Sequence, residues 1–163
     1  MSKNILIASL VGIVIVAIAV AVIFHAQSGA HIELTGKILK VRTAPIDENS
    51  SVAAVDFRVS DPANYAFMAK SVTLIVVDAN GKQIEGSTVS EPDAKRIFDA
   101  IPLLGPKYNT SMIIGERIAP HATVDRMSSA RFEVPDATLE SRKNLILRIE
   151  EVDGRATAEF TEK

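Results

Sequence analysis

The stretch VAAVDFRVSDPANYAF, residues 52–67, joins an alternating strand pattern to a corner broken by proline. Apolar side chains occupy every second position from Ala53 to Val59, and polar side chains fall between them at Asp56, Arg58 and Ser60. Strict alternation of this kind is typical of an antiparallel strand with one face in the core and the other in solvent. The stretch therefore predicts a half-buried strand in a mainly β protein.

The corner that follows this strand could serve either chemistry or structure. Asp61 or Asn64 can accept hydrogen bonds from backbone N–H groups of the following residues, and Pro62 fixes φ and ends the ladder. Tyr65 and Phe67 are then expected to cover the end of the core. We interpret the corner as structural. On this interpretation Asp61→Asn is tolerated, because an amide oxygen can accept the same bond.

Short strand patterns recur along most of the remaining chain. The turn at residues 78–81 joins two of them into a hairpin, with Gly81 supplying the positive φ. Strands at this regular spacing predict an immunoglobulin-like antiparallel β-sandwich, with an open barrel as the alternative. The expected strands are residues 31–42, 52–60, 70–77, 82–89, 111–119, 122–127, 130–134, 145–152 and 155–162.

One short helix is predicted between these strands. Ser90 offers a capping hydroxyl, and Pro92 and Asp93 occupy the first turn, as is typical of a helix start. The helix is expected to run to Ala100 and to plug an open end of the sandwich. Its apolar side is formed by Ala94, Ile97, Phe98 and Ile101. A polar crossover at residues 135–144 can hold one further helical turn.

The N-terminal region contains 20 residues, from Ile5 to Phe24, without charge or proline. At about 1.5 Å per residue this run matches a hydrocarbon core of about 30 Å, and it predicts a transmembrane helix that serves as a signal anchor. The expected organisation is a cytoplasmic tail at residues 1–4, a span at 5–24, a juxtamembrane linker at 25–31 and a β-sandwich domain at 32–163.

Two alternatives to an uncleaved anchor remain open. A buried helix of a soluble protein would need protein on all sides, because this run is apolar all round. A cleaved signal peptide would use the small residues at 28–30, but the apolar run exceeds the usual signal core of about 7–15 residues. Lys3 before the span favours a cytoplasmic N-terminus and an extracytoplasmic C-terminal domain.

Composition narrows the classes of partner. The chain has 18 basic and 20 acidic residues, and their signs are interspersed. Such a balance predicts no nucleic-acid binding and no polybasic patch for anionic lipids. Without cysteine there is no disulfide framework and no lipid attachment through cysteine. The expected partners are the lipid bilayer, through residues 5–24, and a protein partner or second copy through small residues at Ala8, Gly12, Ala17 and Ala21.

No catalytic, cofactor-binding or metal-ligating residue is predicted. The histidines His25, His31 and His121 lack ligand spacing, and no recognisable nucleophile–base motif occurs. The acidic group at residues 150–153 could hold a cation, but an edge that discourages strand aggregation explains it better. The residues singled out are those of structural turns: Asp61, Pro62, Asn64 and Gly81.

The segments VDFRVSDPANYAF and SVTLIVVDANGKQIEG resemble the core of the type-2 late-embryogenesis-abundant (WHy-type) domain. In that family a strand ends in an Asn-Pro-Asn-like corner, and residues 118–122 also resemble a later I-x-P-G-x segment. Asp61 replaces Asn, and His121 stands where glycine is usual. Other membrane-tethered bacterial sandwich domains show similar patterns. The resemblance implies a non-catalytic immunoglobulin-like sandwich with a stress-protective or envelope role.

The sequence thus predicts a non-catalytic, single-span module of the cell envelope with a binding or stress-protective role. A structural accessory subunit of a membrane protein complex is the second hypothesis. A hydrolase with a dispersed site is the third, and the absence of a recognisable catalytic motif counts against it.

Overall fold

A computed structural model of the chain describes residues 12–21, 34–154 and 156–162. Contacts divide the chain into two units, Met1–His31 and Ile32–Lys163. In the first unit residues 12–21 are helical with exposed side chains. Within the described residues, no helix is both long and apolar enough to cross a membrane. The rest of the predicted span at 5–24, and the linker at 25–31, lie outside the described residues.

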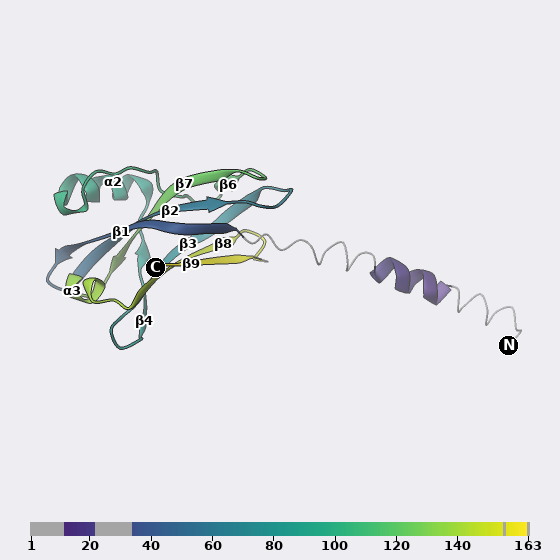
Figure 1. Cartoon of the computed structure of the whole chain (residues 1–163), viewed down its shortest axis with the longest axis horizontal. Helices are drawn as coiled ribbons and strands as arrows, with labels where there is room; N and C mark the ends of the chain where they lie inside the picture. Colours follow the sequence, from purple (N-terminus) through teal and green to yellow (C-terminus); the bar gives the residue numbers. More distant parts are fainter. Residues whose placement is uncertain (1–11, 22–33, 155, 163) are drawn as a thin grey trace, which may run out of the picture. The chain divides into compact units, whose positions relative to one another are not determined.

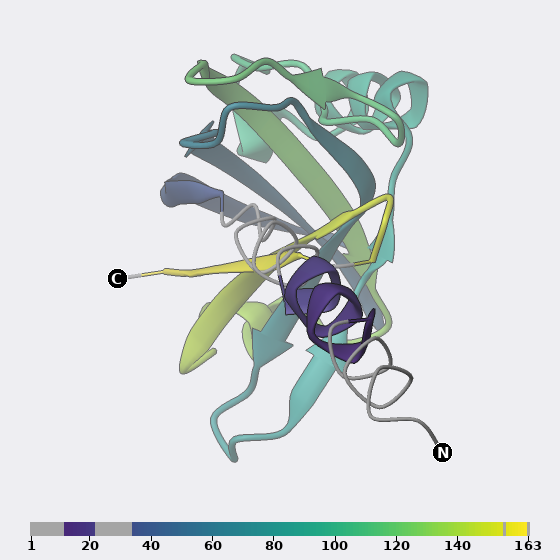
Figure 2. The ribbon, with the colours of Figure 1, turned by 90° about the vertical axis from the view of Figure 1, so that its right-hand side faces the viewer.

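The second unit is an antiparallel β-sandwich with short helices (Figures 1 and 2). One sheet has the order β1-β2-β7-β5, and the other has the order β4-β3-β8-β9, with β6 paired to β3. The predicted mainly β sandwich is therefore confirmed. Its elements are β1 (Thr35–Asp47), β2 (Ser50–Ser60), β3 (Phe67–Val77), β4 (Gln83–Glu85), β5 (Ser87–Thr88), α2 (Glu91–Ala100), η1 (Pro102–Leu104), β6 (Arg117–Ile118), β7 (Thr123–Phe132), α3 (Asp136–Glu140), β8 (Asn144–Glu151) and β9 (Thr157–Thr161).

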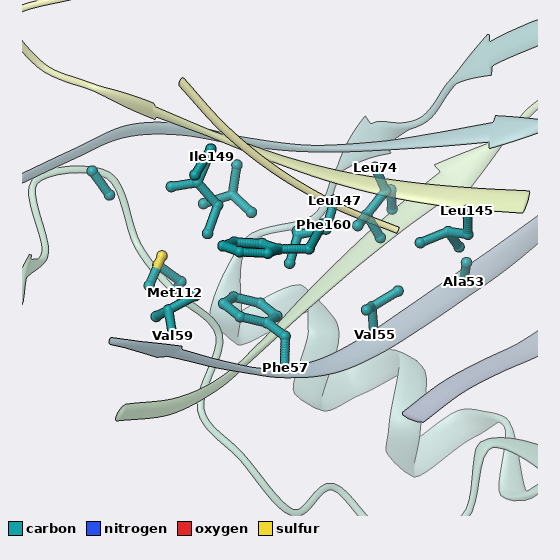
Figure 3. Close-up of a cluster of buried hydrophobic side chains, with 14 of the residues drawn as sticks. Ala53, Val55, Phe57, Val59, Leu74, Met112, Leu145, Leu147, Ile149 and Phe160 are labelled. Carbon is teal, nitrogen blue, oxygen red and sulfur yellow. The ribbon is translucent and has the colours of Figure 1, made fainter. Parts of the chain in front are cut away.

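The main core lies between the two sheets. The inward positions predicted for β2 are confirmed, since Ala53, Val55, Phe57 and Val59 are all fully buried. Facing them are the alternate residues of β8, which are also fully buried: Leu145, Leu147 and Ile149. Figure 3 shows the rings of Phe57 and Phe160 turned toward each other across this core. Strand alternation thus supplies both walls of one apolar layer.

The outer face of β2 is not in solvent, so the prediction of a half-buried strand is wrong. Val52, Ala54 and Asp56 point away from the main core, yet they are 0%, 0% and 3% exposed. Helix α2 covers this face, and Phe98 packs in a second apolar cluster with Ala94, Leu104, Ala44, Val52, Ala54 and Met127. The helix therefore lies against the outside of a sheet and does not plug an end (Figure 1). The apolar side of an amphipathic helix needs such a surface.

The predicted return strand at residues 82–89 is divided between the two sheets. Residues 83–85 pair with β3, and residues 87–88 pair with β7 in the opposite sheet. Gly86 is the crossing point, and its N–H donates to the Leu74 carbonyl at 2.9 Å. A Cβ at this position would lie 2.6 Å from Cζ of Phe132, so the crossing has room only for glycine.

Two further strand predictions are wrong in their boundaries. The patterns at 122–127 and 130–134 form one continuous strand, β7, through the small buried residues Ser128 and Ser129. Of the pattern at 111–119, only β6 is a strand. The rest crosses between sheets: the Met112 N–H donates to Met127, and the Gly115 N–H donates to Ala69. The helical turn expected within residues 135–144 is present as α3.

Candidate functional site

The corner after β2 is built around a buried carboxylate. Asp61 is 1% exposed, and its Oδ1 accepts from the Ala63 N–H at 2.9 Å. Its Oδ2 accepts from the N–H of Phe67, the first residue of β3, at 3.0 Å. The backbone N–H of Asp61 donates to the carbonyl of Ala122 at 3.0 Å, which ties the corner to the approach to β7. Both carboxylate oxygens therefore hold backbone in place.

The remaining predicted turn residues lie at the surface. Pro62 is exposed, and the exposed Asn64 places its Oδ1 3.1 Å from Nε2 of His121. His121 has a φ of 58°, the left-handed region in which glycine is at ease. Gly81 has a φ of 88° and closes the other turn, 78–81, where its N–H donates to the Asp78 carbonyl. Tyr65 is 43% exposed, so the expectation that it covers the core is wrong.

The two bonds of Asp61 change what is expected of Asp61→Asn. An amide has one acceptor oxygen, so either the Ala63 or the Phe67 N–H loses its partner, and the latter bond is buried. We expect a loss of about 1–3 kcal/mol in the free energy of unfolding, because an unpaired buried donor is costly. Chemical denaturation measures this change. A variant with wild-type stability would contradict the geometry, and with lost ligand binding it would favour a catalytic or binding role.

A second polar centre lies beneath α2 and the loop that follows it. Nη2 of Arg42 lies 2.5 Å from Oδ2 of Asp56, and the two side chains are 8% and 5% exposed. Oδ1 of Asp56 accepts from Nδ2 of Asn109 at 2.8 Å. Nη1 of Arg42 donates to the carbonyls of Leu104 and Pro106, both at 2.8 Å. This ion pair joins β1 and β2 to the loop at residues 102–110.

Aromatic rings enclose the same guanidinium. Cζ of Arg42 lies 4.8 Å from the centroid of the Phe98 ring and 5.6 Å from that of Tyr108. Both distances are in the range of cation–π attraction. Neither Arg42 nor Asp56 was predicted to have a role, since Asp56 was placed in solvent. With the acid and the base bonded to each other and to the loop, the arrangement fixes the outer layer and offers no free base.

Glu91, the first residue of α2, ties the helix start to the far end of this loop. Its Oε1 lies 2.7 Å from Nζ of Lys107, and its Oε2 accepts from the Ser111 N–H at 2.7 Å. Burial of the Glu91 carboxyl acts to raise its pKa, but the bonds from Lys107 and Ser111 outweigh it. The pKa of Glu91 therefore lies below its ordinary value of 4.5.

This lowered pKa predicts a pH dependence of stability. A carboxyl whose pKa is lower in the folded than in the unfolded chain stabilises the fold fully above its unfolded pKa. The contribution is lost as the pH falls through the folded pKa, so the window lies at and below about pH 4.5. We expect Glu91→Gln to be less stable than wild type at neutral pH and the difference to shrink below that value. Urea midpoints measured across pH check this, and a constant difference would contradict it.

A groove of about 450 Å³ lies where the two sheets present their edge strands β1 and β9. It is lined by residues 36–41 and 159–162. The register of β1 shifts at Leu39, and Lys37 and Lys40 beside it are exposed. Bulges and lysines on edge strands discourage the addition of another strand. The groove is therefore a protected seam of the sandwich.

Among the described residues, no group of three His, Cys, Asp or Glu side chains is placed to hold a metal ion. The acidic residues of the closing hairpin do not gather into such a group. Glu150 lies 3.7 Å from Nζ of Lys70 on the neighbouring strand β3, at the surface.

The comparisons with known proteins return distant structural likenesses. No family model matches the sequence, and no curated protein matches it. An uncharacterized β-sandwich protein from Clostridium difficile 630 is 12% identical, with 80% of this chain and 86% of that chain covered at a TM-score of 0.42. A Bordetella pertussis protein proposed to be ApaA is 14% identical, with 82% and 90% covered at a TM-score of 0.38. At these TM-scores neither likeness carries an argument about the activity of this chain.

Proposed function

We propose that this chain is a non-catalytic, single-span membrane-anchored module of the cell envelope. Residues 5–24 form the transmembrane anchor, and the β-sandwich lies outside the cytoplasm in a binding or stress-protective role. The sandwich is of immunoglobulin-like type, as the resemblance of residues 55–67 and 71–86 to type-2 late-embryogenesis-abundant domains implies.

One observation carries this proposal. A charge-free apolar run long enough to cross a bilayer is followed, after a short linker, by a domain with its own core. The run ends at Phe24, and the sandwich begins by Leu34, whose side chain is 5% exposed in the main core. A domain that completes its core from residue 34 onward does not need the preceding apolar run. The apolar run is therefore available to cross a bilayer, and a transmembrane helix requires about 20 such residues.

The buried charges of the domain support a role without catalysis. Asp61 holds two backbone N–H groups, and Arg42 and Asp56 hold each other and the loop above them. Catalytic acids and bases need a reacting group within hydrogen-bond reach. Each of these three side chains is already hydrogen-bonded to a structural partner within the protein.

A second candidate is a structural accessory subunit of a membrane protein complex. Leu103 and Tyr108 favour it, because these side chains are 78% and 65% exposed on the outer layer next to α2. Both belong to the loop at residues 102–110, and exposed apolar side chains of this size are a feature of protein contact surfaces. Purification of the full chain in mild detergent separates the two functions: a stoichiometric protein partner favours the subunit, and its absence favours the module.

The anchor is tested by carbonate extraction of membranes from cells that produce the chain with a C-terminal tag. We expect the full-length protein to stay in the membrane pellet, because a spanning helix resists alkaline extraction. A variant without residues 5–24 is the control and should be released. Release of a shortened product that starts near His31 would instead identify a cleaved signal peptide.

A further inference from the structure

Four large apolar side chains are exposed in three loops of the sandwich. We name this set the apolar tip; it consists of Tyr65 (43% exposed), Ile113 (54%), Ile114 (79%) and Val152 (46%). A surface that covers the tip would remove this apolar area from water.

The three loops lie at one end of the sandwich. Ser60, the last residue of β2, pairs with Thr35 at the start of β1 and with Thr123 at the start of β7. Tyr65 is in the corner that follows Ser60. The loop of Ile114 and the turn of Val152 both bond to the start of β3, through Gly115 N–H to Ala69 at 2.7 Å and Val152 N–H to Met68 at 3.0 Å. Figure 2 views the molecule from this side.

The N-terminal segment joins the sandwich at this same end. Strand β1 begins at Thr35, so the connection to the apolar run at residues 5–24 leaves from beside the corner. Residues 25–33 separate Phe24 from Leu34, and even fully extended they span no more than about 35 Å. If the run crosses a bilayer, the tether keeps the start of the domain, and with it the end of the sandwich that carries the apolar tip, within about 35 Å of that bilayer.

We propose that the apolar tip inserts into the interfacial region of the bilayer that holds the chain. This inference rests on the proposed membrane anchor. The tether makes insertion an intramolecular event, so contacts too weak to recruit a free domain suffice to dock an anchored one. Tyrosine is well suited to the interface, because its ring is apolar and its hydroxyl stays hydrated.

The charges of this end fit a neutral lipid surface. Two acids beside the loops are paired: Glu116 lies 2.6 Å from Nε of Arg126, and Asp125 lies 2.6 Å from Nε of Arg58. Asp153, next to Val152, is exposed. The exposed Arg117 pairs with Met68 at the start of β3, and the exposed His121 lies beside Asn64 of the corner, so both belong to this end and can face headgroup phosphates. Because apolar side chains carry the contact, docking should not require anionic lipid.

The chain has no cysteine, so a single introduced thiol can carry an environment-sensitive fluorophore. The probe variant is Ile114→Cys, and the matched control is Leu103→Cys, since the two side chains are 79% and 78% exposed. Leu103 lies far from the apolar tip. The carbonyl of its neighbour Leu104 accepts from Arg42, and Arg42 lies about 20 Å along β1 from Thr35, at the end that carries the tip. Both full-length variants are labelled and reconstituted into phosphatidylcholine vesicles, with and without lipids that bear a quencher near the headgroup.

We expect blue-shifted emission and strong quenching for the label at 114, and aqueous emission with little quenching for the label at 103. Emission typical of water at both positions, in protein that floats with the vesicles, would overturn the inference and leave the anchor intact. A blue shift at 114 without quenching by lipid would also overturn it, because a protein or a second copy would then cover the tip. Failure to float would contradict the anchor and the inference together.

Discussion

Phe57→Ala is expected to lower the free energy of unfolding by about 3–5 kcal/mol, the usual cost of emptying a buried phenylalanine site. Phe57 is fully buried on β2 in the main core, and Figure 3 shows its ring facing that of Phe160, with Val59 and Val55 on either side. The ring is held by both sheets, so neither can move inward to fill the space without breaking its own strand pairing. A loss of this size is a large part of the total stability of about 5–15 kcal/mol.

The neighbouring residue supplies the control for this measurement. Arg58 points to the opposite face, and its ion pair with Asp125 has side chains 48% and 37% exposed. Ion pairs in such exposed positions contribute little to stability because water screens them, so Arg58→Ala should be nearly neutral. Denaturant unfolding of both variants checks the difference. Equal losses at 57 and 58 would contradict the inward and outward assignment of β2.

Asp56→Ala is expected to cost about 3–5 kcal/mol, because it leaves the guanidinium of Arg42 buried without its counter-charge. The two side chains are only 8% and 5% exposed, so water cannot replace the carboxylate without opening the outer layer. The Asn109 side chain loses its acceptor as well. We therefore expect the loop at residues 102–110 to loosen, with faster hydrogen exchange at backbone amides there than in β8.

The double variant Arg42→Met/Asp56→Leu provides the test of the pair itself. Replacement of both charges by apolar side chains removes the desolvation cost, so it should be less destabilised than Asp56→Ala alone. Strictly additive losses would mean that the two side chains do not act as a pair.

The strands were predictable to the extent that their signal is local. Alternation with a period of two identifies the inward face of β2 from residues 53–59 alone, and the structure confirms it. The opposite face depends on what packs over it, which is a tertiary property. A signal was nevertheless present, because Val52 and Ala54 are apolar on the face that Asp56 shares. Apolar residues on the outer face of a strand, together with an amphipathic helix elsewhere in the chain, predict that the helix packs on that face.

The structural roles of charged residues were harder to predict. Asp56 and Arg42 are 14 residues apart, and nothing in the spacing distinguishes them from solvent-facing charges. The role of Gly86 depends on Phe132, a residue far away in sequence. Ile113 and Ile114 have the composition of a strand, yet the structure places them in an exposed loop. In all three cases the sequence specifies the residue type and the fold decides its neighbours.

The central claim is that an intact chain holds its β-sandwich outside the cytoplasm. Its most direct test is the labelling of full-length Leu103→Cys in intact cells with a membrane-impermeant maleimide, since this is a cysteine-free chain with an exposed side chain at 103. We expect labelled, full-length protein in the membrane fraction without permeabilisation. Labelling only after lysis, or labelled protein in the soluble fraction alone, would contradict the claim.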